Sequence, residues 1–116
     1  MTIEELQAIC QELPGVTEDI KWEHDLCFSV GGKMFLVVGL SQLPTTASFK
    51  VTPEEFANLT SRADFVPARY LARHHWVLVE DIHRLPAQEW ALHAGQSYAL
   101  VVARLPKKVQ QALRLA

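Results

Sequence analysis

The sequence predicts an α+β fold, a two-layer sandwich in which helices cover one face of an antiparallel sheet. Apolar residues recur at helical spacing near both ends of the chain, as in amphipathic helices. Between them lie short segments of alternating polarity separated by turn residues, as in consecutive strands. Strands joined by short loops pair antiparallel, and a sheet with one apolar face needs helices to cover it. With 49% apolar residues, the 116-residue chain is expected to form a single domain over residues 1–116.

The first predicted element is an amphipathic helix at the N-terminus. Thr2 and Glu5 have the spacing of a capping box, and Pro14-Gly15 ends the pattern. Four apolar residues at helical spacing form the inward face of this helix: Ile3, Leu6, Ile9 and Leu13. The acidic segment 16–25 that follows is expected to be a solvated loop.

Three strands are predicted next. Residues 26–30 alternate in polarity, and residues 33–40 continue as an apolar stretch. Gly31-Gly32 between them supplies the positive φ values that a tight turn demands. Residues 47–51 alternate again and are expected to pair as the third strand.

A second helix and a second hairpin follow. Thr52 can cap this helix, and Pro53 suits its first turn because the missing N–H costs nothing there. The strands of the hairpin are expected near residues 69–71 and 75–80, joined at 73–74.

The last predicted element is a long helix. It begins at Pro86 and carries apolar residues along one side, and Pro106 starts a separate final turn or short helix. The predicted order of elements is therefore α-β(3)-α-β(2)-α.

The composition favours a cytoplasmic monomer. Two cysteines do not make a disulfide framework, and the acidic N-terminus differs from a signal peptide. The longest apolar run, residues 34–40, is far shorter than the roughly 20 residues of a membrane-spanning helix. The formal net charge is −2, which leaves room only for a local basic patch on a nucleic-acid binder.

Four motifs in a fixed order give the chain a family resemblance. They are Phe28 to Phe35 (FSVGGKMF), Phe49 to Glu55 (FKVTPEE), Tyr70 to Val79 (YLARHHWVLV) and Ser97 to Val101 (SYALV). Over nearly its whole length the chain resembles the MmcQ/YjbR family of small bacterial proteins. The resemblance implies a fold like that of secretion chaperones and a DNA-binding role in which paired β-hairpins act as wings.

The densest basic and aromatic cluster lies between Arg69 and Trp76. Arginines on a hairpin can contact phosphates or base edges, and an aromatic ring can stack on an unpaired base. The residues expected to contact DNA are Lys33, Lys50, Arg69, Arg73, His74 and His75. The alternative is a solvated hairpin rim in which Tyr70 and Trp76 are packing residues.

The sequence contains no motif for catalysis, metal binding or cofactor binding. The five histidines and two cysteines lack the paired spacings of a zinc site, and neither a nucleophile motif nor a glycine-rich phosphate loop occurs. Cys10 and Cys27 are therefore expected to be packing residues, and Ser97 and Tyr98 to serve structural roles. We expect a protein that is not an enzyme and that needs no metal or cofactor.

Two functions remain open. The first is weak, salt-dependent DNA binding through the 69–76 hairpin with little sequence specificity, since phosphate contacts would dominate. The second is a chaperone-like protein-interaction module that uses strand addition or a helix-in-groove contact. A contiguous basic patch favours the first, and an exposed apolar patch of several hundred Å² favours the second.

Overall fold

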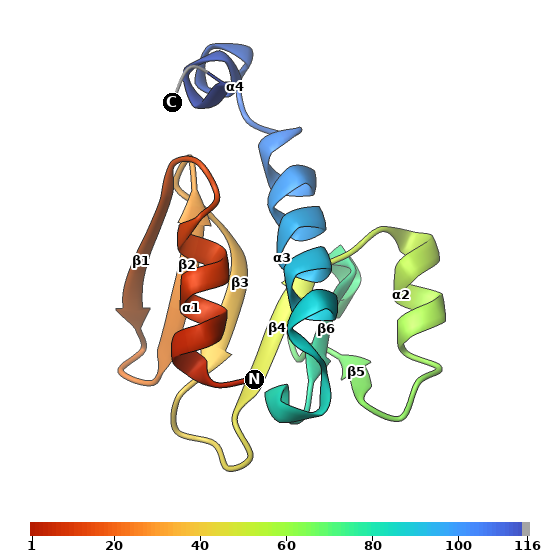
Figure 1. Cartoon of the computed structure of the whole chain (residues 1–116). Helices are drawn as coiled ribbons and strands as arrows, with labels where there is room; N and C mark the ends of the chain where they lie inside the picture. Colours follow the sequence, from red (N-terminus) through yellow and green to blue (C-terminus); the bar gives the residue numbers. More distant parts are fainter. Residues whose placement is uncertain (115–116) are drawn as a thin grey trace.

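The computed structural model describes residues 1–114, which form a six-stranded antiparallel sheet and four α-helices (Figure 1). The helices are α1 (Ile3–Gln11), α2 (Pro53–Leu59), α3 (Ala87–Val102) and α4 (Lys107–Arg114). The strands are β1 (Val16–Lys21), β2 (Asp25–Val30), β3 (Lys33–Gly39), β4 (Thr46–Lys50), β5 (Phe65–Pro67) and β6 (Trp76–Val79). The 3-10 helices η1 (Ala72–His74) and η2 (Ile82–Arg84) flank β6. The predicted α+β class is confirmed.

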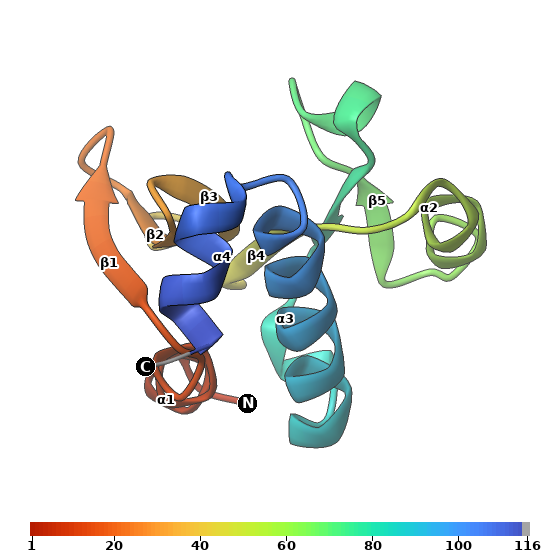
Figure 2. The same ribbon diagram turned by 90° about the horizontal axis from the view of Figure 1, so that it is seen from above.

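The strands lie in the order β1-β2-β3-β4-β6-β5, and each pairs antiparallel with its neighbours. Helix α2 and strand β5 make the connection between β4 and β6, so β5 forms one edge of the sheet and β1 the other. Viewed from above, α1 and α3 lie on one side of the sheet, while the β1–β2 turn and the β5–β6 connection curve to the other side (Figure 2). We refer to these as the covered face and the uncovered face.

The covered face packs an aromatic cluster against α3. The Phe49 ring of β4 lies 5.8 Å from the Trp90 ring, 4.8 Å from the His93 ring and 6.5 Å from the Phe65 ring, measured between centroids. Trp90 also donates its indole N–H to the carbonyl of Ile82 at 3.0 Å, which satisfies its buried polar atom. These contacts fix α3 against the middle of the sheet.

Ser97 and Tyr98 of α3 join segments that are distant in the sequence. The Ser97 hydroxyl donates to the carbonyl of Phe35 at 2.5 Å and accepts from the backbone N–H of Lys50 at 3.0 Å. It therefore bridges β3 and β4 beyond the end of their own pairing. Tyr98 donates to the carbonyl of Pro14 at 2.5 Å, and its ring packs edge-on against Phe35. The structural roles predicted for both residues are confirmed.

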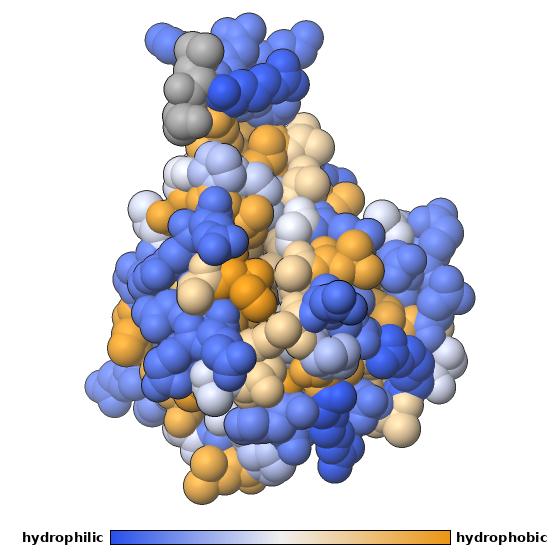
Figure 3. Space-filling model, viewed as in Figure 1, coloured by the Kyte–Doolittle hydropathy of each residue, from blue (hydrophilic) through white to orange (hydrophobic). Residues whose placement is uncertain are grey.

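Helix α4 lies over the end of the sheet that carries the β2–β3 turn (Figures 1 and 2). Leu105, just before it, lies against Gly31, where an added Cβ would be only 2.6 Å from the Leu105 Cδ1 atom. The space-filling view shows a hydrophilic surface on α4 and apolar side chains beneath it, where it joins α3 (Figure 3). Among residues 1–114, no helix combines the length and apolar character needed to cross a membrane.

The prediction of a solvated loop at residues 16–25 is wrong, because most of this segment forms β1. The inward position Glu18 is polar, and its carboxylate accepts hydrogen bonds from the side-chain amides of Gln7 and Gln11 on α1. This edge strand therefore contacts the helix through a satisfied carboxylate, and the usual alternation of apolar residues is missing from the sequence. The order of elements gains one strand over the predicted α-β(3)-α-β(2)-α.

The strand predicted at 69–71 is also wrong. The strand that pairs with β6 lies earlier, at Phe65–Pro67, and residues 68–75 form the compact β5–β6 connection that contains η1. The Ala68 N–H donates to the carbonyl of Trp76 at 3.0 Å and closes this connection. Tyr70 within it has φ 69°, which no strand residue adopts.

Candidate functional site

The uncovered face of the sheet carries two adjoining cavities. The strand register places Val37 of β3 beside Ser48 of β4 and Lys50 of β4 beside Trp76 of β6, all on this face. Lys50 and Trp76 line one cavity, and Val37 and Ser48 line the other. Met34 lines both cavities, so they share a wall.

The first cavity, which we call the basic pocket, has a volume of about 310 Å³. It lies where the β2–β3 turn, the end of β4 and the C-terminal end of α3 meet. Its lining, as residues 1–114 provide it, includes no acidic side chain and four basic ones: Lys33, Lys50, His74 and Arg104. The positive charge in this cavity is therefore free to attract an anion.

The pKa of Lys50 reflects its burial and the neighbouring positive charge in the basic pocket. Its ammonium donates to the carbonyl of His74 at 3.1 Å. Burial lowers the pKa of Lys50 below its ordinary value, and the positive charge of Arg104 lowers it further. A bound anion would act in the opposite direction, because it favours the charged form of the lysine.

The local structure explains how these cations meet. Lys33 follows the tight turn at Gly31 and Gly32, whose φ values of 58° and 80° are easily reached only by glycine. Lys50 ends β4 and is held there by the hydroxyl of Ser97. Arg104 lies in the turn just after α3, where its backbone N–H donates to the carbonyl of Val101 at 3.1 Å.

The second cavity, which we call the aromatic groove, has a volume of about 610 Å³. Its walls are Trp22 from the β1–β2 turn and Arg69 with Tyr70 from the β5–β6 connection. The side chains of Trp22 and Tyr70 are 65% and 83% exposed. The Arg69 guanidinium lies 5.3 Å from the centre of the Tyr70 ring, within the range of a cation–π contact.

The backbone that presents these two rings is unusual. Trp22 and Tyr70 have φ values of 52° and 69°, in the left-handed region that residues other than glycine adopt rarely. Both rings are thus held out from tight turns rather than folded into the core. Such outliers concentrate at binding and catalytic sites.

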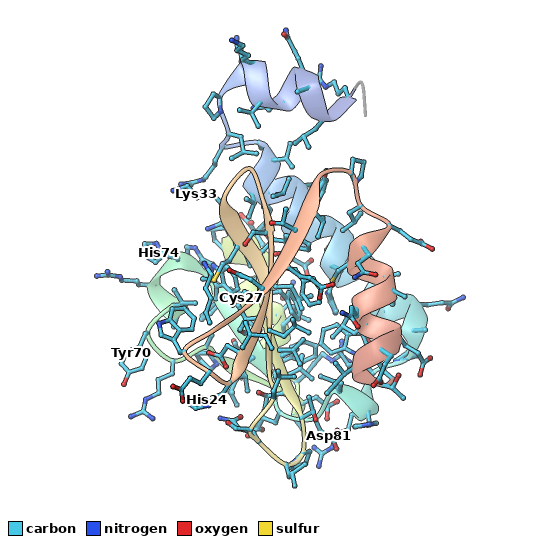
Figure 4. The ribbon with its side chains drawn as sticks, turned by 90° about the vertical axis from the view of Figure 1, so that its left-hand side faces the viewer. His24, Cys27, Lys33, Tyr70, His74 and Asp81 are labelled. Carbon is cyan, nitrogen blue, oxygen red and sulfur yellow. The ribbon has the colours of Figure 1, made fainter. Side chains whose placement is uncertain are left out.

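The structure unites three of the six residues predicted to contact DNA. Lys33, Lys50 and His74 line the basic pocket, and Arg69 lines the adjoining groove. Figure 4 shows Lys33, His74 and Tyr70 on the side of the sheet away from α1. Lys33 and Lys50 thus lie beside residues of the 69–76 segment, and residues of β2, β3 and α3 complete the lining of the two cavities.

The remaining two predicted residues line neither cavity. Arg73 is exposed within η1. His75 has φ 62°, and its ring packs edge-on against Phe56 of α2 at 5.6 Å. Of the two aromatic residues weighed as packing residues, Trp76 is buried and Tyr70 is exposed.

Sequence reasoning did not assign Arg104 and Trp22 to the site. Arg104 lies in the turn after α3, between the long helical pattern and Pro106, and nothing in the sequence indicates which side chains this turn approaches. Trp22 is an aromatic residue in an acidic segment, and its exposure shows that it does not fill the edge of the core.

The two cysteines have the packing role predicted for them. Cys10 and Cys27 are both fully buried, and burial raises the pKa of the Cys10 thiol to about 12. Burial also raises the pKa of Cys27. Within residues 1–114, no group of three or more histidine, cysteine or acidic side chains is arranged to hold a metal ion.

Comparisons with known proteins agree with this architecture. The model of the YjbR family matches residues 11–100. A crystal structure of a Deinococcus radiodurans protein with a DUF419 domain superposes with a TM-score of 0.87 at 28% identity, covering 97% of this chain and 87% of that chain. A Pseudomonas syringae protein shares the fold at 20% identity, with a TM-score of 0.72 and coverage of 86% and 98% of the two chains. The comparison with curated proteins gives no match.

Proposed function

This chain belongs to the YjbR family, and from that premise we propose that it is a cytoplasmic, non-enzymatic nucleic-acid-binding protein that holds phosphates in its basic pocket. The observation that carries the proposal is the meeting of Lys33, Lys50 and Arg104 in one cavity without a carboxylate in its described lining. Phosphate oxygens are the common partners of such clustered lysine and arginine side chains.

The affinity should be modest and should depend strongly on salt. The formal net charge is −2, and acidic residues such as Glu18 and Asp19 lie on β1. Attraction is therefore local to the basic pocket, and long-range steering of a polyanion is weak. Only a few phosphates can be contacted at once, so binding should weaken as counterions compete.

The test is a fluorescence-anisotropy titration of labelled DNA with a Lys50→Met/Arg104→Met variant. The slope of log K against log salt should fall by roughly 0.7 per lost contact on a single strand and 0.9 on duplex. The matched control is Arg62→Met/Arg84→Met, which removes the same charge. Both arginines make ion pairs with other residues, Arg62 with Glu89 and Arg84 with Asp64. Equal loss in the two variants, or no binding at low salt, would contradict the proposal.

A protein partner is the alternative function, and the β1 edge favours it. One side of β1 has no strand neighbour in the sheet of residues 1–114, and Ile20 on it is 59% exposed. An extended segment of a partner could pair with this edge through backbone hydrogen bonds. Replacing the exposed Ile20 with lysine, a residue that disfavours pairing at a sheet edge, changes no residue that lines the basic pocket, so partner binding lost in that variant alone would establish this function.

A further inference from the structure

The aromatic groove adds a second kind of contact next to the basic pocket. From its two exposed rings and its shared wall with the cations, we infer that this groove binds unpaired bases, so that the protein selects single-stranded over duplex nucleic acid. The inference rests on the proposed function and narrows its ligand to single strands.

The two aromatic rings of the groove are placed where a base could stack on them. Trp22 and Tyr70 come from turns near opposite edges of the sheet, and both line the same cavity. Large aromatic side chains usually gain stability by burial, yet these two remain mostly exposed. Exposed rings beside a basic surface are the common stacking platform for unpaired bases, because every base has a flat π face.

The rest of the groove lining is mostly apolar. Met34 and Val37 contribute apolar surface, and Ser48 contributes a hydroxyl that can donate or accept. At about 610 Å³, the groove is within the range of pockets that enclose small organic ligands. A flat, largely apolar nucleobase fits such a lining better than a phosphate does.

The two cavities differ in the charges of the side chains that line them. The basic pocket carries Lys33, Lys50 and Arg104, whereas the lining of the aromatic groove includes the carboxylate of Asp25 as well as Arg69. A carboxylate repels phosphate, but it accepts hydrogen bonds from base N–H groups, including the ring N–H of an unpaired thymine. The backbone of a bound strand would therefore lie at the basic pocket and its bases in the aromatic groove.

Duplex nucleic acid does not suit this arrangement. The faces of paired bases are stacked on one another, and only their edges are open in the grooves. Rings held on two opposite walls could reach base faces only after the bases had left the stack. The adjacent cations also favour a nucleic acid over an uncharged peptide as the occupant of the groove.

The experiment compares a labelled thymidine oligonucleotide, its duplex with the complementary strand, and an abasic oligonucleotide of the same length. Trp22→Ala and Tyr70→Ala are each expected to weaken single-strand binding about 5- to 140-fold, the range for loss of one stacked base. The salt slope should not change, because no phosphate contact is lost. Trp22→Phe and Tyr70→Phe should largely retain binding. The abasic strand should bind the wild-type protein at least as weakly as each alanine variant binds the thymidine oligonucleotide, because it can stack on neither ring.

Tryptophan fluorescence provides a second readout. Trp90 is completely buried and Trp76 lines the basic pocket, so quenching that is present in the wild-type protein and lost in Trp22→Phe reports on a base stacked on Trp22. Leu43→Ala is the control, because this apolar side chain is 94% exposed and lines neither cavity. Thermal unfolding of every variant checks that its fold is intact.

The outcomes separate the two proposals. The inference is supported if the protein binds the single strand more tightly than the duplex and if the alanine variants lose this difference. Equal or tighter duplex binding, or single-strand binding that the alanine substitutions leave unchanged, would overturn the inference and leave the proposed function standing. No binding to any of the oligonucleotides at low salt would overturn both.

Discussion

The two faces of the sheet differ in what their side chains do. On the covered face, Leu36 of β3 and Phe49 of β4 are paired neighbours that are completely buried beneath α3. One residue further along each strand, Val37 and Lys50 point to the uncovered face and line cavities. Because side chains alternate along a strand, one residue packs in the core while the next lines a cavity on the uncovered face. Stability and binding should therefore respond to different substitutions.

The largest expected effect comes from the covered face. Phe49→Ala should lower the free energy of unfolding by about 3–5 kcal/mol, because it removes a ring that packs on three others. The adjacent substitution Ser48→Ala on the uncovered face should change it by less than about 0.5 kcal/mol. Urea denaturation of the two variants measures the contrast. Comparable losses would show that the faces are not separate.

Ser97→Ala should have the next largest effect. It removes the hydroxyl that bridges the Phe35 carbonyl and the Lys50 N–H, and it leaves both backbone groups without that partner. The expected cost is about 1–3 kcal/mol by urea denaturation. Ser41→Ala, an exposed serine in the β3–β4 connection, is the control. Since Ser97 also positions Lys50, we expect weaker nucleic-acid binding in this variant, and unchanged affinity would contradict that link.

Lys50→Met should separate binding from stability. The pKa of Lys50 is lowered in the folded protein by burial and then by Arg104, so the unfolded chain holds the proton more tightly. Its charge therefore opposes folding below the folded-state pKa, and this penalty disappears as the pH rises to the ordinary value of 10.5. The stability of Lys50→Met relative to wild type should thus be greatest near neutral pH and should decline towards pH 10.5. A pH-independent difference in urea denaturation would refute this explanation.

The smallest effect concerns the two thiols. Cys10 faces the core beneath α1, and its pKa is raised to about 12, whereas Cys27 lies on the uncovered face. Because the thiolate is the reactive form, both should react slowly with a thiol reagent in the native protein. In single-cysteine variants Cys27 should react faster, since local opening on that face displaces no helix. Equal rates would mean that both thiols become accessible only on global unfolding.

The local signals in the sequence predicted most of the fold. The capping box at Thr2, the Gly31-Gly32 turn and the Thr52-Pro53 helix start all lie where expected, because each depends on neighbouring residues. Strand β1 could not be recognised, because the partners of Glu18 come from a helix that the sequence does not place beside it. Residues 69–71 contain Tyr70, a residue type that is common in strands, but they lie in the β5–β6 connection, where Tyr70 adopts a φ of 69°.

The candidate site was only partly predictable for the same reason. Lys33, Lys50 and His74 stood out as basic residues near predicted turns and strand ends, and the structure brings them together. Arg104 joins them because the turn after α3 lies at the same end of the sheet as the β2–β3 turn. The aromatic groove depends on two turns that are almost 50 residues apart in the sequence and become opposite walls only after the strands are ordered.

The irregular pairing of β2 with β3 limits how this hairpin can change length. The register shifts between Phe28 and Ser29, where Phe35 is the additional residue on β3 and lies buried on the covered face. Met34, before the shift, faces the two cavities, and Leu36, after it, faces the core. Deleting Phe35 alone would give a shorter hairpin with continuous pairing, but it would also remove the ring that Tyr98 packs against. Lineages of this protein should therefore gain or lose residues in the β3–β4 connection and keep the length of the β2–β3 hairpin constant.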